Sequence, residues 1–129
     1  MQTFKKNERL CSKKSIDDLF LNGQSFHVYP FKILWIKVSE LSDSPARIVI
    51  SVPKRNFKKA VQRNQAKRLI REAYRKQKSV LYQHLQEKKE EINFALIYTG
   101  KELLSYQELE IKIKLIIHRL IKADEKTIG

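Results

Sequence analysis

The spacing of apolar residues predicts a short helix near the start of the chain, over residues 12–22. Its apolar positions fall on one helical face: Ile16, Leu19 and Phe20. Ser12 stands where an N-cap residue accepts a backbone hydrogen bond, and Gly23 stands where many helices end in a C′ glycine. The segment is therefore expected to begin and end as a discrete helix.

Four segments have the composition or the alternation of β-strands. Residues 31–38 (FKILWIKV) and 92–98 (INFALIY) are rich in β-branched and aromatic side chains. Residues 46–52 (ARIVISV) have the period of a strand, and a short further strand is expected at 25–28. The residues at 42–45 are expected to form the turn between the strands at 31–38 and 46–52.

A basic helix is predicted from about residue 58 to 77, followed by a second, more polar helix over 80–90. At about 100° per residue, one side of the basic helix is apolar and carries Ala66, Leu69, Ile70 and Ala73. The opposite side carries Asn64, Lys67, Arg68, Arg71 and Arg75, with Arg63 on the flank between. One side is thus suited to a core, and the other presents a row of positive charges.

The last element is predicted as a long amphipathic helix near the C-terminus. Residues 105–108 (SYQE) match a capping box, and Leu104 and Leu109 occupy the two positions of a hydrophobic staple. An apolar stripe follows: Leu109, Ile113, Ile116, Ile117, Leu120 and Ile121. Residues 122–129 are expected to be a frayed tail.

The element order and the charge balance predict one α+β domain, residues 1–129, that binds a polyanion. Helices packed on a small antiparallel or mixed sheet are expected. Residues 54–78 hold eleven Lys or Arg and one acid, Glu72, so they carry +10 of the formal net charge of +13. Like charges on one helix face destabilise it, and a nucleic-acid backbone neutralises them with release of counterions.

Other interpretations of the basic helix fit less well or stay open. A merely solvated helix usually mixes charges of both signs, and a membrane-surface helix usually has Trp or Phe on its apolar face. A helix-turn-helix needs two closely linked helices, whereas a strand and Pro53 precede this helix. Asn64 either contacts a nucleic acid beside Arg63 or caps the helix near its start, and both alternatives stay open.

Several function classes lack their sequence signals. The chain has three glycines and no Gly-rich phosphate loop, which argues against a nucleotide-binding enzyme. His27, His84 and His118 lack metal-ligand spacing, and Cys11, the single cysteine, has no evident partner base. We therefore expect no protein catalytic site and no protein-bound metal. The single cysteine and the lack of an opening signal segment favour the cytoplasm, and the apolar runs are too short for a membrane span.

Aromatic side chains gather in the first third of the chain: Phe20, Phe26, Tyr29, Phe31 and Trp35. Unpaired bases stack on such rings with about 1–3 kcal/mol per base, although any one ring is more often part of a core. Trp35 shares a strand face with Phe31, Ile33 and Lys37. A ring beside a lysine on an open sheet face would suit single-stranded nucleic acid.

Residues 60–74 (AVQRNQAKRLIREAY) resemble the RNR signature of the bacterial ribonuclease P protein component. The pattern A-V-x-R-N-x-x-K-R-x-x-R-E is long and specific, and the resemblance extends along nearly the whole chain. Arg9-Leu10 precedes a helix that carries Phe20, a strand pair leads to Lys54-Arg55, and a Ser-Tyr-x-Glu-Leu helix closes the domain.

The resemblance implies a small basic subunit of a ribonucleoprotein that removes the 5′ leader from precursor tRNA. It implies that the RNA subunit is the catalyst and works with Mg²⁺, and that neither a metal on the protein nor a protein partner is required. The implied fold is a two-layer α/β sandwich with about four strands. A left-handed βαβ crossover around the RNR helix is also implied, against the usual right-handed rule.

The resemblance also implies roles for individual residues. The residues implied to contact RNA are Lys54, Arg55, Lys58, Lys59, Arg63, Asn64, Lys67, Arg68, Arg71 and Arg75. The residues implied to line a leader cleft beside the sheet are Phe20, Trp35 and Ile16. Ile16 stands where the family commonly has an aromatic residue, and a register shift of one would place Leu34 in the cleft instead of Trp35. The alternative function is a general RNA-binding or ribosome-associated module without a processing role.

Overall fold

A computed structural model describes residues 6–38 and 44–126 of the chain. A short 3-10 turn is followed by one helix, three strands, a long helix, a fourth strand and a last helix. Their bounds are η1 Lys6–Glu8, α1 Lys13–Asn22, β1 Gln24–Val28, β2 Phe31–Val38, β3 Ala46–Ser51, α2 Ala60–Lys88, β4 Glu91–Tyr98 and α3 Tyr106–Lys126. Each of the four predicted strands is confirmed to within one residue at either end.

The four strands form one mixed sheet in the order β1-β2-β4-β3. β2 pairs antiparallel with both β1 and β4, which places Trp35 opposite Gln24 on one side and Phe94 on the other. β3 lies parallel to β4, with Ile48 opposite Phe94, so the chain must cross over between them, and α2 forms that crossover. The predicted α+β fold is confirmed, and the left hand of the crossover stays a prediction.

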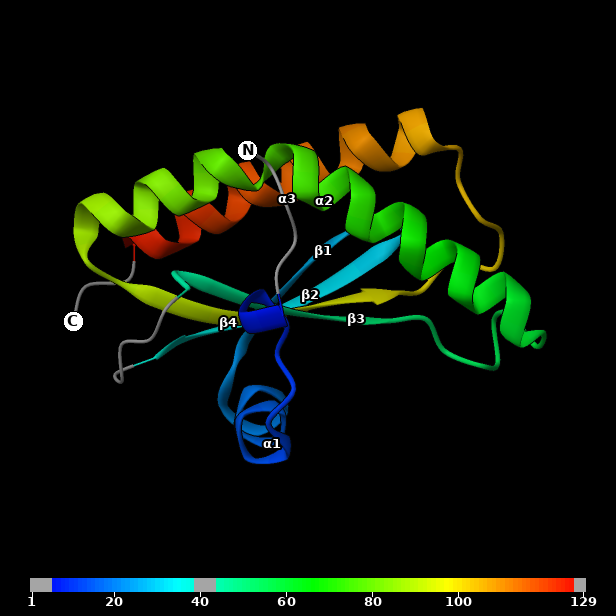
Figure 1. Cartoon of the computed structure of the whole chain (residues 1–129), viewed down its shortest axis with the longest axis horizontal. Helices are drawn as coiled ribbons and strands as arrows, with labels where there is room; N and C mark the ends of the chain where they lie inside the picture. Colours follow the sequence, from blue (N-terminus) through cyan, green and yellow to red (C-terminus); the bar gives the residue numbers. More distant parts are fainter. Residues whose placement is uncertain (1–5, 39–43, 127–129) are drawn as a thin grey trace.

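Helices α2 and α3 pack side by side over one face of the sheet, and α1 lies against the other face (Figure 1). Alternate side chains of each strand point to opposite faces, so each strand serves both layers. The core beneath α2 and α3 takes Phe31, Ile33 and Trp35 from β2. The smaller cluster beneath α1 contains Leu10, Leu19, Leu34 and Ala95.

Two predicted helix starts are confirmed by their capping hydrogen bonds. Ser12 Oγ accepts from the backbone N–H of Ser15 at 3.3 Å, before α1. Ser105 Oγ accepts from the backbone N–H of Glu108 at 3.2 Å, before α3. Leu109, the predicted staple residue inside α3, is fully buried.

Gly23 ends α1 for a different reason from the predicted one. Its φ of −70° and ψ of 153° are extended values that any residue can adopt, so it is not a left-handed C′ glycine. A Cβ at this position would lie 2.4 Å from the carbonyl oxygen of Leu19 and 3.1 Å from that of Trp35. Glycine is needed here because a side chain would collide with the last turn of α1 itself, and the backbone of β2 also lies close.

The prediction of two helices over 58–77 and 80–90 is wrong, because α2 is continuous over 29 residues. Lys78 and Ser79, which lie at the predicted break, are neither proline nor glycine, and nothing there interrupts the backbone ladder. The helix ends only at Lys89, which adopts a left-handed conformation with φ of 56°.

The prediction of a frayed tail is wrong for residues 122–126. Helix α3 continues to Lys126, and Asp124 in its last turn is only 3% exposed. The polar side chain of Asp124 is held there by partners on other elements, which the sequence pattern alone does not reveal. Residues 127–129, and residues 42 and 43 of the predicted turn, lie outside the described part of the chain.

Candidate nucleic-acid interface

The basic surface begins in the loop before α2, and Arg63 connects that loop to the helix. Lys59 is the N-cap residue, but its side chain makes no capping hydrogen bond. Arg63 Nη1 instead donates to the carbonyl oxygens of Phe57 and Lys58, both at 2.9 Å. Phe57 is buried and packs its ring near that of Tyr98, with centroids 5.7 Å apart. Arg63 therefore has a structural role in addition to its charge.

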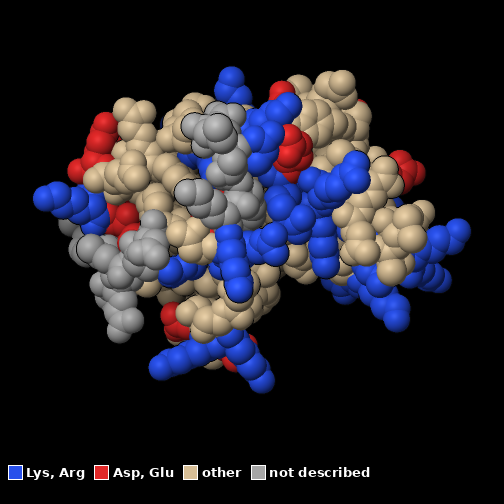
Figure 2. All heavy atoms as spheres, viewed as in Figure 1, with Lys and Arg blue, Asp and Glu red and all other residues tan. Residues whose placement is uncertain are grey.

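The residues predicted to contact RNA lie at or near the surface. The exposed ones are Lys54, Arg55, Lys58, Lys59, Asn64 and Arg68, and the partly buried ones are Arg63, Lys67, Arg71 and Arg75. The buried residues of this half of α2 are Ala66, Ile70, Ala73 and Tyr74. Figure 2 shows Lys and Arg side chains gathered over α2 and the loop before it. The predicted cationic side of the helix is confirmed, and its contact with RNA stays a prediction.

Within the described residues, carboxylates leave most of this charge without an ion pair. Arg75 Nε donates to Glu72 Oε2 at 3.0 Å, and this hydrogen bond lowers the pKa of Glu72 and raises that of Arg75. The other eight predicted cations form no ion pair within residues 6–38 and 44–126. We call these eight residues the open cationic face: Lys54, Arg55, Lys58, Lys59, Arg63, Lys67, Arg68 and Arg71.

The last cation of the basic stretch is used inside the protein. Lys78 is 6% exposed, and its Nζ donates to both carboxylate oxygens of Glu8, at 2.6 and 2.8 Å. The two residues are 70 positions apart in the sequence. No local pattern signals such a pair, so the count of +10 for residues 54–78 overstates the charge that is open to a partner.

The residues predicted to line one cleft lie on opposite faces of the sheet. Phe20 is 51% exposed on α1, and Ile16, one turn earlier, packs against the cluster beneath α1. Trp35 is 2% exposed in the core beneath α2 and α3, so the prediction that it lines the same cleft is wrong. Leu34, the alternative, points to the α1 side. A shift of one residue reverses the face of a strand side chain, which explains the error.

The sheet surface on the α1 side is only partly covered. Val49 of β3 and Ile97 of β4 pack against the cluster beneath α1 but remain partly exposed. β3 ends at Ser51, three residues before the exposed Lys54. An apolar surface beside cations suits unpaired nucleotides, because their bases stack while their phosphates meet positive charge.

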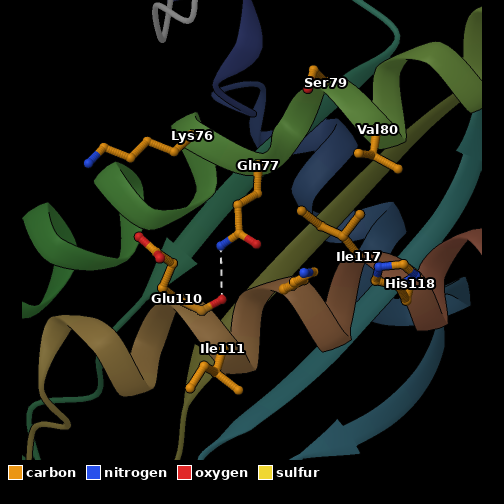
Figure 3. A pocket seen from close by; sticks show the side chains of 9 residues that line it. Lys76, Gln77, Ser79, Val80, Glu110, Ile111, Ile117 and His118 are labelled. Atoms are coloured by element: carbon orange, nitrogen blue, oxygen red, sulfur yellow. Dashed lines mark hydrogen bonds between the residues drawn. The ribbon is translucent and has the colours of Figure 1, made fainter.

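A groove of about 520 Å³ lies between α2 and α3. Gln77 reaches across it from α2 and donates from Nε2 to the backbone carbonyl oxygen of Glu110 at 2.9 Å (Figure 3). Its rim combines the exposed apolar side chains of Val80 and Ile111 with Lys76. Lys114 of α3 also lines this groove, which we interpret as the packing seam of the two helices.

A charged cluster joins the far ends of α2 and α3. Asp124 Oδ2 hydrogen-bonds His84 Nε2 at 2.9 Å, and its other oxygen lies 3.4 Å from Lys37 Nζ. Burial acts to raise the pKa of Asp124, but its interactions with Glu90, with the His84 ring and with the positive charge of Lys37 outweigh it, and the net shift is downward. This cluster stabilises the C-terminal end of the helical layer.

Within the described residues, no three or more His, Cys, Asp or Glu side chains are grouped as a metal site would require. In the same part of the chain, none of the helices combines the length and the apolar composition of a membrane span.

The sequence is similar to a known family and to named relatives within it. The family model "Ribonuclease P" matches residues 4–120. The ribonuclease P protein component of Porphyromonas gingivalis (strain ATCC 33277) is 36% identical over 105 residues, which cover 81% of this chain and 77% of the relative. That of Chlorobium phaeobacteroides is 33% identical over 130 residues, which cover 93% of this chain and 89% of the relative.

Solved structures share the fold. The RNase P protein of Staphylococcus aureus superposes with a TM-score of 0.71 at 19% identity, covering 88% of this chain and 94% of that one. The RNase P protein of Thermotoga maritima superposes with a TM-score of 0.69 at 24% identity, covering 87% of this chain and 96% of that one. At these identities the likeness supports the mixed four-stranded sheet with its packed helices.

Proposed function

The chain belongs to the ribonuclease P protein family, and we propose that its open cationic face binds the RNA subunit while the α1 side of the sheet holds the 5′ leader of precursor tRNA. The protein is a subunit of the ribonuclease P holoenzyme, which processes the 5′ end of tRNA, and its partner is the ribonuclease P RNA. The observation that carries the residue assignment is the set of eight cations without a carboxylate partner among the described residues.

The open cationic face has the chemistry for a ribose-phosphate backbone. Arginine offers a planar fork of donors that matches phosphate oxygens, and lysine offers a compact charge. Arg68 and Arg71 lie one turn apart on α2, so neighbouring phosphates of one strand can meet both. Asn64, which is exposed beside them, adds a donor and an acceptor for a base edge or a ribose hydroxyl.

The leader is proposed to lie on the α1 side of the sheet. Phe20 and Ile16 of α1 and Val49 and Ile97 of the sheet offer apolar contacts for bases. The loop with Lys54 follows directly from β3 and places positive charge at the end of that surface. An apolar surface that is followed by cations supports a single-stranded segment of precursor tRNA as the occupant.

The protein's contribution is electrostatic and positional. Leader phosphates and the catalytic RNA repel each other, and cations placed between them lower that repulsion and strengthen substrate binding. We propose that Mg²⁺ is bound by oxygen ligands of the RNA subunit, which suits a hard cation. We also propose that the protein works in the cytoplasm, where the exposed thiol of Cys11 stays reduced.

The test joins binding with cleavage. With about five to eight phosphate contacts, the slope of log affinity for ribonuclease P RNA against log salt should be about −4 to −7. Added to that RNA at low magnesium, the protein should increase cleavage of precursor tRNA at the leader junction. A slope near zero would remove the cationic face from the proposal. Binding without any gain in cleavage would favour a general RNA-binding module.

A further inference from the structure

The N-terminal segment, residues 6–10, is attached to α2 and to β3 by contacts between distant parts of the chain. Both oxygens of Glu8 accept from Lys78 on α2, at 2.6 and 2.8 Å, and both side chains are less than 10% exposed. The backbone N–H of Leu10 donates to the carbonyl oxygen of Ile48 at 2.9 Å. The segment therefore has a defined position along the edge of β3.

The charges of this segment divide into an inner acid and outer cations. Glu8 is buried, whereas Lys6 and Arg9 on either side of it are exposed. Arg47 of β3 also lies at this edge, and its Nε donates to the carbonyl oxygen of Asn7 at 3.2 Å. The acid of the segment is neutralised inside the protein, so the surface of the segment is positive.

The Glu8–Lys78 pair places these cations next to the open cationic face. Lys78 lies seven residues after Arg71, which is two turns along the same side of α2, about 10 Å away along the helix axis. Residues 6–10 are therefore attached to α2 about two turns beyond Arg71, and a single nucleic-acid strand that spans this length carries several phosphates. In Figure 1, η1 lies at the sheet between the α1 and α2 layers, and Figure 2 shows Lys and Arg on this face from α2 toward α1.

Protection of an edge strand does not account for this arrangement. A segment that only covers the edge of β3 needs backbone hydrogen bonds or a charged side chain. A buried ion pair adds little net stability over apolar residues of similar size, because both charges must be removed from water. Its geometric effect is to fix the register of residues 6–10 on α2, with the two cations directed outward.

We propose that residues 6–10 form a second RNA-contacting element, in which Lys6 and Arg9 bind a ribose-phosphate backbone and the Glu8–Lys78 pair positions them. This inference rests on the proposed function, and it extends the surface beyond α2 and its loop. The backbone belongs either to the ribonuclease P RNA or to the leader of precursor tRNA, since both present the same phosphate chemistry to the two cations.

The contact test uses the double variant Lys6→Ala/Arg9→Ala, with Lys88→Ala/Lys89→Ala as its control. Both variants remove two exposed positive charges, and the control removes them at the far end of α2. The first arm measures affinity for ribonuclease P RNA against salt. The second measures how much more tightly the reconstituted holoenzyme binds precursor tRNA than mature tRNA.

Loss of the two contacts should make the salt slope less negative by about 1.4 to 1.8 and reduce affinity roughly tenfold or more. A loss in the first arm assigns the backbone to the ribonuclease P RNA, and a loss confined to the second assigns it to the leader. Losses no larger than those of the control in both arms overturn the inference. If the unaltered protein itself does not bind the RNA, the proposed function fails instead.

The positioning role is tested by the variant Glu8→Leu/Lys78→Met, which replaces the ion pair by apolar side chains. The amide of Leu10, bonded to Ile48 in β3, should then exchange its hydrogen faster while the thermal unfolding transition stays cooperative. RNA binding should weaken toward that of Lys6→Ala/Arg9→Ala. Unchanged exchange at Leu10, or faster exchange with unchanged RNA affinity, overturns the positioning role.

Discussion

The two halves of α2 differ in how their charges are neutralised. In residues 60–74, Lys67, Arg68 and Arg71 have no ion pair among the described residues, and Arg63 bonds to carbonyl oxygens. In residues 75–88, the fold supplies a partner for Arg75, Lys78 and His84: Glu72, Glu8 and Asp124 in turn. The positive charge counted along the sequence is therefore larger than the charge that is available to a binding partner. The fold pairs these three side chains internally, whereas Lys67, Arg68 and Arg71 form no ion pair among the described residues and remain open to a partner.

The largest expected effect is on the neutralised half, from Lys78→Met. This change leaves the carboxylate of Glu8 buried without its cation, and it should lower the free energy of unfolding by about 3–5 kcal/mol. Urea denaturation measures the loss. The further change Glu8→Leu removes the orphaned charge and should restore most of the stability. A single variant as stable as the unaltered protein would contradict a structural role for this pair.

In the first half of α2, the double variant Arg68→Ala/Arg71→Ala should weaken RNA binding and leave stability almost unchanged. Affinity for ribonuclease P RNA should fall roughly tenfold to a hundredfold, with the salt slope less negative by about 1.4 to 1.8, because two phosphate contacts are lost. Stability to urea should stay almost unchanged, since neither side chain has a carboxylate partner within the described residues. Lys88→Ala/Lys89→Ala is the matched control, and an equal loss of affinity in it would show that only net charge matters.

The charged cluster around Asp124, at the far end of α2, should make the free energy of unfolding depend on pH in the acid range. The folded protein holds the pKa of Asp124 below its usual value of 3.8, so the carboxylate favours folding above that pH, and this contribution disappears as the pH falls through the folded-state pKa. Asp124→Asn should cost about 1–2 kcal/mol at pH 7 and should flatten the fall in Tm between about pH 5 and pH 2. Parallel Tm curves for both proteins would refute this account.

The smallest expected effect comes from Glu72→Gln, which releases Arg75 from its partner in the middle of the helix. Because an exposed ion pair contributes little to the free energy of unfolding, stability should change little. RNA affinity should rise by a fewfold, since one acid is removed beside the open cationic face and one guanidinium becomes available. A fall in affinity would show that Glu72 orients Arg75 toward RNA.

Local patterns in the sequence predicted those parts of the fold that depend on local physics. The hydroxyls of Ser12 and Ser105 cap the predicted helices, because capping needs only residues three positions away. Alternation and the content of β-branched and aromatic side chains located all four strands. The same alternation could not say which face of β2 meets α1, and the prediction for Trp35 failed on that choice.

The remaining features depend on contacts that join distant segments. Nothing near Lys78 indicates that its partner is Glu8, and nothing near Arg63 indicates that it bonds to the carbonyl oxygens of Phe57 and Lys58. The sequence pattern placed Arg63 on the flank of the cationic side, whereas in the structure it also holds the loop before α2 through those two carbonyl oxygens. The candidate interface was recognisable from its residue types, but its limits were set by tertiary packing.

The unbroken course of α2 has a mechanical consequence. Twenty-nine residues form a rod about 43 Å long, and its second half is anchored to η1 and α3 by bonded side chains. RNA bound at the first half of α2 could therefore rotate relative to the sheet only if the whole helix moved with it. The proposed leader surface on the α1 side of the sheet would thus keep a fixed orientation relative to RNA bound at the open cationic face.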